Sequence, residues 1–166
     1  MQDNEFHTVR GYQLLKQETK LLTPAMEDYL EMIYRNIQDE GYMRINTLSE
    51  LLNVKPSSST KMVQKLTELG FLDYKKYGII FLTESGKELG KFLLCRHNII
   101  EKFLKSIGIS ENLLIETELI EHNVSVNTLR CIDQFNRYLE VHPEVIKELE
   151  RFKSTGYSEE ENITPE

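Results

Sequence analysis

Cysteine is scarce in this chain: Cys95 and Cys131 are the only two, and they lie 36 positions apart. That spacing excludes a C-x-x-C metal or redox motif, and a single pair so placed makes no disulfide framework. We expect each cysteine to be a small, buried apolar residue instead of a reactive thiol.

Long apolar runs are also missing. None approaches the roughly 18 residues that a membrane-spanning helix needs, and the N-terminal residues 1–5 have neither the basic nor the apolar part of a secretory leader. We therefore expect a cytoplasmic protein with no membrane partner. The 166 residues suffice for one domain, or for two small ones sharing a core.

An overall positive charge is lacking too, because the formal net charge is −7, which excludes a protein that coats nucleic acid generally. The charge is unevenly placed, however. Residues 55–91 hold seven lysines against four acids, whereas residues 110–166 hold thirteen acids against five basic residues. This asymmetry indicates a DNA-facing segment followed by a segment with another task.

The first half of the chain has the pattern of a winged helix-turn-helix. Thr23-Pro24 is a helix start, and apolar residues at the helical period continue to about Asp39. Two short helices, 45–52 and 56–69, follow across a brief turn, which is the helix-turn-helix arrangement. Residues 71–83 then predict two strands around a Lys-Lys-Tyr-Gly turn.

The second of the short helices has the chemistry of a recognition helix. Its first turn offers hydroxyls and free backbone N–H groups to phosphates, and its polar face offers further donors. The lysines of the hairpin turn are placed to lie along the DNA backbone. The predicted DNA contacts are Ser57, Ser58, Ser59, Thr60, Lys61, Gln64, Lys65, Lys75 and Lys76.

The second half predicts only helices, over residues 84–106, 111–123, 126–142 and 143–153. Their apolar stripes exceed what so few helices can bury, so a homodimer is expected. The fold class is therefore mainly α. The predicted parts are an N-terminal extension with at most a short helix (1–21), a winged helix-turn-helix domain (22–90), a helical metal-binding and dimerisation domain (91–154), and a disordered tail (155–166).

Metal ligands are suggested by the string Glu118-Leu119-Ile120-Glu121-His122. On a helix, Glu118, Glu121 and His122 fall within roughly 60° of one another, and the apolar pair between them predicts that this helix lies against a core. Asp28 and Glu31, three residues apart, share a helix edge in the same way. Each group also has a plainer interpretation: a surface charge cluster for the first, and acids favoured by the helix dipole for the second.

Four separated motifs together resemble the diphtheria-toxin-repressor family of metal-dependent regulators. They are residues 24–31 (PAMEDYLE), residues 56–66 (PSSSTKMVQKL), Arg96-His97, and Ile120-Glu121-His122. The manganese-sensing branch is the best match, over about residues 22–153. The iron-sensing branch has Met and Cys where this chain has Asp28 and Glu118, and it usually adds a C-terminal barrel. Asn123 departs from the branch, some of whose members have a second His there.

The resemblance implies a manganese-activated repressor of metal-uptake genes that binds operator DNA and takes no small organic substrate. It implies two Mn²⁺ ions per subunit, with Glu31 and Glu121 as bridging ligands. The implied ligands are Asp28, Glu31, His97, Glu118, Glu121 and His122. Four carboxylates and two imidazoles without a thiolate form a hard donor set, which suits Mn²⁺ or Fe²⁺ better than structural Zn²⁺.

Three other functions stay open at this point. An iron-responsive repressor of the same family would share the fold. A metal-independent winged-helix repressor would use the acidic cluster only as a polar network between domains, and His97 as a structural residue. A dimetal hydrolase would need an open metal position and a substrate cleft.

Overall fold

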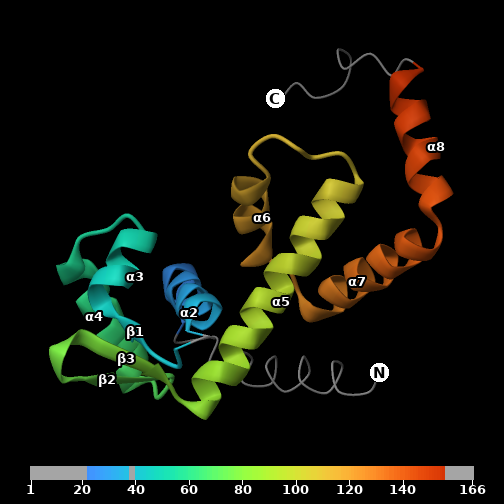
Figure 1. Cartoon of the computed structure of the whole chain (residues 1–166). Helices are drawn as coiled ribbons and strands as arrows, with labels where there is room; N and C mark the ends of the chain where they lie inside the picture. The colour runs from blue at the N-terminus through green and yellow to red at the C-terminus, as the bar shows by residue number, and fades with distance from the viewer. Residues whose placement is uncertain (1–21, 38–39, 156–166) are drawn as a thin grey trace, which may run out of the picture. The chain divides into compact units, whose positions relative to one another are not determined.

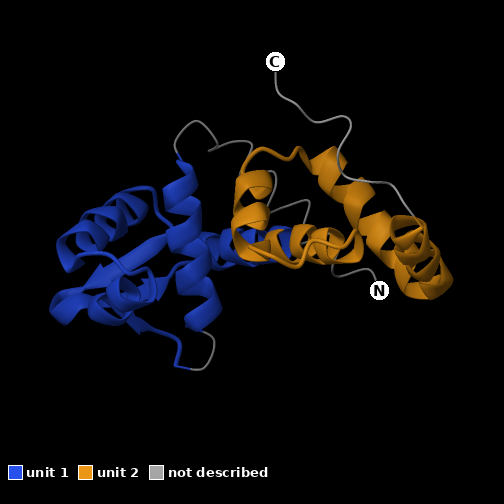
Figure 2. Ribbon diagram, turned by 90° about the horizontal axis from the view of Figure 1, so that it is seen from above, with its two compact units in different colours: residues 1–96 blue, residues 97–166 orange. Residues whose placement is uncertain are grey.

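The computed structural model describes residues 22–37 and 40–155 (Figure 1). The chain divides into two compact units, residues 1–96 and residues 97–166 (Figure 2). The predicted short helix within residues 1–21, and residues 156–166 of the predicted disordered tail, lie outside the described residues. Among those described, no helix combines the length and the apolar character needed to cross a membrane.

The first unit opens with helix α2 (Pro24–Asn36), whose start follows the predicted chemistry. The Thr23 hydroxyl accepts a hydrogen bond from the backbone N–H of Met26, and Pro24 fills the first helical position, where no N–H is needed. The helix ends at Asn36, earlier than the predicted Asp39. Ile37 makes the last helical hydrogen bond, to the Ile33 carbonyl, and the left-handed Gly41 then turns back to bond Ile37.

Helices α3 (Ile45–Leu51) and α4 (Pro56–Glu68) confirm the predicted helix-turn-helix. Asn53, in the turn between them, has a left-handed φ of 51°, which asparagine tolerates better than most residues. On α4, Val63 and Leu66 are fully buried, so this helix presents its opposite side outward.

The hairpin consists of β2 (Leu72–Lys75) and β3 (Ile79–Leu82), joined by the short 3₁₀ turn η1 (Lys76–Gly78). A further strand, β1 (Met43–Arg44), was not predicted, because two residues are too few to show an alternating pattern. It pairs antiparallel with β3, which gives the strand order β1-β3-β2. The extra strand ties the start of α3 to the wing.

Helix α5 (Glu84–Ser106) follows the sheet, and its first half packs closely against α2. A Cβ atom placed on Gly90 would lie 2.5 Å from the Cβ of Tyr34, so only glycine permits this approach. Six residues further on, Arg96 forms an ion pair with Glu27, near the other end of α2. The two helices therefore run antiparallel along each other.

The second unit contains the last part of α5 with helices α6 (Leu113–Glu121), α7 (Val126–Val141) and α8 (Pro143–Ser154). Its core holds Ile100 and Leu104 from α5 and Val126, Leu129 and Leu139 from α7. The two helices are also joined by a hydrogen bond that the Asn136 amide donates to the Ile99 carbonyl, at 2.9 Å.

Helix α8 adds no fully buried residue. It is joined to the end of α5 by a hydrogen bond from the Lys153 ammonium to the Ile107 carbonyl. At its start, the pKa of the Glu144 carboxyl is lowered by a hydrogen bond from its own backbone N–H and by the His142 side chain.

Two expectations were wrong: the bounds of the helix that carries Glu118 and the burial of the two cysteines. Helix α6 is shorter than residues 111–123, because the left-handed Asn112 precedes it and a tighter i−3 bond from Asn123 closes it. Helix α6 lies against a core, as predicted, but through Thr117 and Glu121, whereas Leu119 is on the opposite side and is 65% exposed. Cys131 is exposed, two residues past the buried Leu129 and therefore on the outer side of α7, and Cys95 is only half-buried.

Candidate metal centre and DNA-binding surface

Asp28 and Glu31 lie one turn apart on α2, as predicted. Asp28 is half-buried and Glu31 is buried. One carboxylate oxygen of Glu31 accepts a hydrogen bond from the Arg35 guanidinium at 2.5 Å. A carboxylate so buried needs positive charge nearby, and α2 supplies part of it from its own next turn.

Beside these residues, Glu27 and Arg96 form an ion pair that sequence reasoning missed. The Arg96 guanidinium donates to the Glu27 carboxylate at 2.8 Å, and both side chains are about nine-tenths buried. The pair fixes the rotation of α2 about its axis, because Glu27 must face α5. Asp28 follows Glu27 directly, and His97 follows Arg96, so the pair holds a predicted ligand on each of two helices in place.

In the second unit, the structure brings three predicted ligands together around the Glu121 carboxylate. The His97 Nδ1 atom lies 3.0 Å from one oxygen of Glu121, and the His122 Nε2 atom lies 3.7 Å from the other. Glu121 is 2% exposed and His97 is 6% exposed. A buried carboxylate thus presents each of its two oxygens to a different imidazole.

Glu118 does not join this group. Its side chain is exposed, and within the described residues it makes no hydrogen bond or ion pair with the other predicted ligands. Glu118 precedes Glu121 by three positions, so its Cα lies on the same side of α6, about 60° away.

The donor chemistry around Glu121 fits a divalent metal ion. Divalent first-row ions hold nitrogen and oxygen ligands at about 2.0–2.2 Å, so neighbouring ligands of one octahedral ion are about 3 Å apart. The His97 nitrogen and the Glu121 oxygen are 3.0 Å apart, which is a hydrogen-bond distance and equals that spacing as well. The donors are imidazole and carboxylate without sulfur. Cys95 precedes His97 by two positions on α5, which places it about 200° away around the helix.

The predicted DNA-binding surface on α4 is largely exposed. Ser57, Ser58, Lys61, Gln64 and Lys65 are all accessible along the helix side opposite the core. Thr60 is half-buried, and its hydroxyl donates to the Pro56 carbonyl at 2.9 Å. At the hairpin, Lys75 and Lys76 are exposed as predicted, with Lys75 paired to Asp73 at 2.7 Å.

Ser59 is the exception, because its side chain is fully buried and lies away from this surface. Ser59 precedes Val63 by four positions and Leu66 by seven, which places it on the buried stripe of α4. The helical period alone could have identified it as a core position. We therefore remove the Ser59 side chain from the proposed DNA contacts.

Two family models match consecutive parts of the chain. Residues 21–80 match the model described as "Iron dependent repressor, N-terminal DNA binding domain", and residues 83–150 match "Iron dependent repressor, metal binding and dimerisation domain". The HTH-type transcriptional regulator MntR of Lysinibacillus sphaericus is 44% identical over 133 residues, which cover 80% of this chain and 96% of that protein.

The chain belongs to the iron-dependent-repressor family. This is the diphtheria-toxin-repressor family that the motifs indicated, and the relatives confirm the predicted manganese transport regulator branch. The regulator MntR of Bacillus subtilis is 45% identical over 121 residues, covering 72% of this chain and 85% of that protein. This chain is accordingly a DNA-binding transcriptional regulator and not an enzyme.

A solved structure of the family confirms the fold class. The manganese regulator SloR superposes with a TM-score of 0.62 at 28% identity, over 70% of this chain and 55% of that chain. This chain therefore has the predicted architecture. It is mainly helical with a small antiparallel sheet, and it has a DNA-binding domain and a metal-binding and dimerisation domain.

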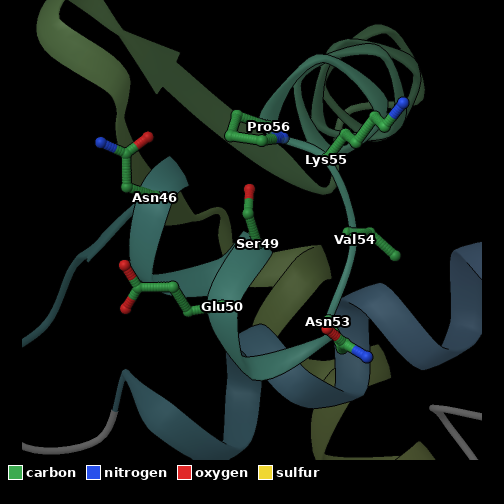
Figure 3. Close-up of a pocket in the computed structure, with 7 residues that line it drawn as sticks. All are labelled: Asn46, Ser49, Glu50, Asn53, Val54, Lys55 and Pro56. Carbon is green, nitrogen blue, oxygen red and sulfur yellow. The ribbon is translucent and has the colours of Figure 1, made fainter.

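A pocket of about 610 Å³ lies in the helix-turn-helix of this regulator, between α3, the turn and the start of α4. Figure 3 shows Ser49 near its centre, with Asn46 and Glu50 on one side and Lys55 on the other. None of the six predicted metal ligands lines it.

Proposed function

We propose that this regulator is a manganese-responsive repressor of metal-uptake genes, which binds operator DNA as a homodimer when each subunit holds two Mn²⁺ ions. The observation that carries the proposal is the buried Glu121 carboxylate, whose two oxygens face the imidazoles of His97 and His122. A carboxylate with one nitrogen donor beside each oxygen is suited to bridge two ions. Family membership supports the same conclusion, since the matching C-terminal model describes a metal-binding and dimerisation domain.

The proposed ligand set combines donors from both units. Helix α2 supplies Asp28 and the proposed second bridge, Glu31, and the second unit supplies the remaining four residues. When bound, the ions would contribute positive charge among carboxylates that otherwise repel one another. The full proposed set is Asp28, Glu31, His97, Glu118, Glu121 and His122.

Manganese is proposed as the effector because the donors are hard and because SloR, a solved relative, is a manganese regulator. Oxygen-rich sites of carboxylate and imidazole favour Mn²⁺ or Fe²⁺ by geometry, although raw affinity rises toward Cu²⁺ and Zn²⁺. Selectivity for Mn²⁺ must therefore come from coordination number and geometry.

The proposed mechanism is a shift of population between arrangements of the chain. Asp28 and Glu31 belong to the helix that precedes the helix-turn-helix, whereas Glu121 and His122 belong to the proposed dimerisation half. Ligands from both units around the same ions would select one arrangement of the recognition helices, spaced to fit two half-sites on DNA.

The homodimer is proposed to form through the apolar side chains that the second unit leaves exposed. Large exposed apolar surface marks protein interfaces, and a twofold dimer buries the same residues on both subunits. The exposed residues are Leu114, Ile115, Leu119, Phe135, Tyr138, Val141 and Phe152.

The test is operator binding by the full chain, titrated at fixed salt with Mn²⁺, Fe²⁺, Zn²⁺ or a chelator. We expect tight binding with Mn²⁺, much weaker binding with Zn²⁺, and loss of binding with chelator. Glu121→Gln should lose the response to Mn²⁺. The matched variant is Glu101→Gln, whose carboxylate pairs with Lys105 and is not among the proposed ligands; it should keep the response.

Two outcomes would select the other regulators. A stronger response to Fe²⁺ than to Mn²⁺ would make this an iron-responsive repressor. Binding that survives the chelator, in both the parent chain and Glu121→Gln, would make it metal-independent and leave the six residues with a structural role.

A further inference from the structure

The tip of the wing carries an aromatic residue in a backbone conformation that suits it poorly. Tyr77 has φ 65° and ψ 20°, in the left-handed region, and its side chain is 89% exposed. A residue with a Cβ is disfavoured there, and the penalty is usually tolerated only where the residue has another use. Within the described residues, the ring gains little from the fold, because it is almost fully in water.

The rest of the described chain shows that a better residue for this conformation is readily available. Among the described residues, the other two non-glycine positions with positive φ are Asn53 and Asn112, at 51° and 53°. Asparagine is several-fold enriched in this region because its short amide bonds the local backbone. The backbone conformation of the turn therefore does not require tyrosine at position 77.

Tyr77 and Gly78, the two left-handed residues of the turn, also could not be swapped in the sequence. Gly78 has φ 73°, and a Cβ added there would lie 2.7 Å from the Cγ2 atom of Ile45. Of the two left-handed positions, only position 77 has room for a side chain, and the side chain there projects outward. The glycine behind it lets the wing rest against the start of α3.

Basic residues lie close to the wing tip in the sheet, and one of them comes from the strand that the sequence did not reveal. Ile79 of β3 pairs with Lys75 on one side and with Arg44 of β1 on the other. Residues directly opposite one another in a sheet point to the same face, so Arg44 and Lys75 flank Ile79 on one face. Both are exposed, and Lys76 is exposed at the adjoining turn.

We propose that Tyr77 and Arg44 form, with the two wing lysines, a contact surface for the sugar–phosphate backbone of operator DNA beyond the bases that α4 reads. An exposed aromatic ring on the same wing as three exposed basic residues fits a polyanion with apolar sugar faces. This inference rests on the proposed binding of operator DNA, and it adds two residues that the helix-turn-helix pattern does not indicate. The strain at Tyr77 is retained for affinity.

The first test replaces the ring with the residue that suits its backbone. Tyr77→Asn should raise the thermal midpoint of the full chain by about 2–4 °C, since it removes the left-handed penalty. The same change should weaken binding to the operator about tenfold, because one good contact is lost. A variant that becomes more stable and binds DNA less well is the expected signature.

The probe is a duplex that the full chain selects from a random-sequence pool in saturating Mn²⁺. It is used in two lengths: one extends a helical turn beyond each half-site, and the other ends at the half-site edges. Tyr77→Asn should weaken binding to the long duplex and leave binding to the short one unchanged.

The second test separates charge from the aromatic contact. Replacing Arg44 with Gln should reduce the slope of log affinity against log salt by about one, because one phosphate contact is lost. Tyr77→Asn should leave that slope unchanged, since tyrosine carries no charge. Arg151→Gln on α8, also an exposed arginine, is the matched control and should change neither affinity nor slope.

Two results would overturn the inference. One is equal affinity of Tyr77→Asn and the parent chain for the long duplex; the other is a lower thermal midpoint for Tyr77→Asn, which would show that the ring stabilises the fold. The metal response is a separate matter. If the parent chain bound DNA equally with Mn²⁺ and with chelator, the manganese proposal would fail, while the ratio between parent and variant would still measure the contribution of Tyr77.

Discussion

At the scale of single residues, buried charges in this regulator are held in pairs that join distant parts of the sequence. Glu27 pairs with Arg96 in the first unit, and Glu121 lies beside His97 in the second. Burying an isolated charge is costly, and a well-aligned partner offsets much of that cost. Each pair also restricts where its helix can point, which positions the neighbouring predicted ligands.

The pair between Glu27 and Arg96 gives a prediction of stability. Arg96→Met should lower the free energy of unfolding by about 3 kcal/mol, because Glu27 would remain buried without this partner. Adding Glu27→Gln should recover part of the loss. Urea denaturation of the single and double variants measures the coupling between the two residues.

The matched control for that cycle is Lys105→Met, which breaks the more exposed pair with Glu101 on α5. Exposed pairs contribute about 0–1 kcal/mol, so this variant should unfold close to the parent. Equal losses for Arg96→Met and Lys105→Met would contradict the role assigned to the buried pair.

At the scale of elements, α6 is a short helix with two different sides. Thr117 and Glu121 face the core, whereas Leu114, Ile115 and Leu119 are more than half exposed. Leu119 is two positions from each buried residue, which places it about 160° from both of them around the helix. The helix therefore serves two surfaces: the inner one carries a predicted metal ligand, and the outer one is available to a second subunit.

The outer surface of α6 gives a prediction of assembly. Leu119→Glu should convert the proposed dimer to monomer, because it would place a charge in an apolar interface. Sedimentation velocity measures the change. Leu51→Glu, at an exposed leucine of α3 in the other unit, should leave the dimer intact. A Leu119→Glu protein that still sediments as a dimer would exclude α6 from the interface.

At the scale of the whole molecule, metal binding would make the net charge of this acidic protein less negative. The formal charge is −7, and two divalent ions per subunit would bring it to −7 + 4 = −3. A less negative protein approaches DNA against less repulsion. Metal binding would thus favour the DNA-bound state through charge as well as through the arrangement of the helices.

Metal removal gives the corresponding prediction for the whole chain. A ligand that binds only the folded state stabilises it by about 2.7 kcal/mol per site at a free concentration about 100 times its Kd. Mn²⁺ should therefore raise the thermal midpoint of the parent chain, and chelator should reverse the increase. Glu121→Gln should show little increase, and an unchanged increase in that variant would argue against Glu121 as a ligand.

The parts of this fold that the sequence could predict are those whose patterns span only a few neighbouring residues. Period and capping identified the helix-turn-helix and the hairpin, because those signals lie within a few residues of one another. The strand β1 has two residues and escaped detection. The hydroxyl of Ser59 predicts a DNA contact, but its place four positions before Val63 puts it on the buried stripe of α4.

The sequence by itself determined the order of the elements, the family motifs and the choice of ligand residues, since each is a local pattern. Only the tertiary structure decided that Glu27 meets Arg96, 69 positions later, and that Glu121 lies between two imidazoles. It also decided that Leu119 faces outward. These outcomes depend on how helices pack, and packing brings together residues whose separation along the chain carries no periodic signal.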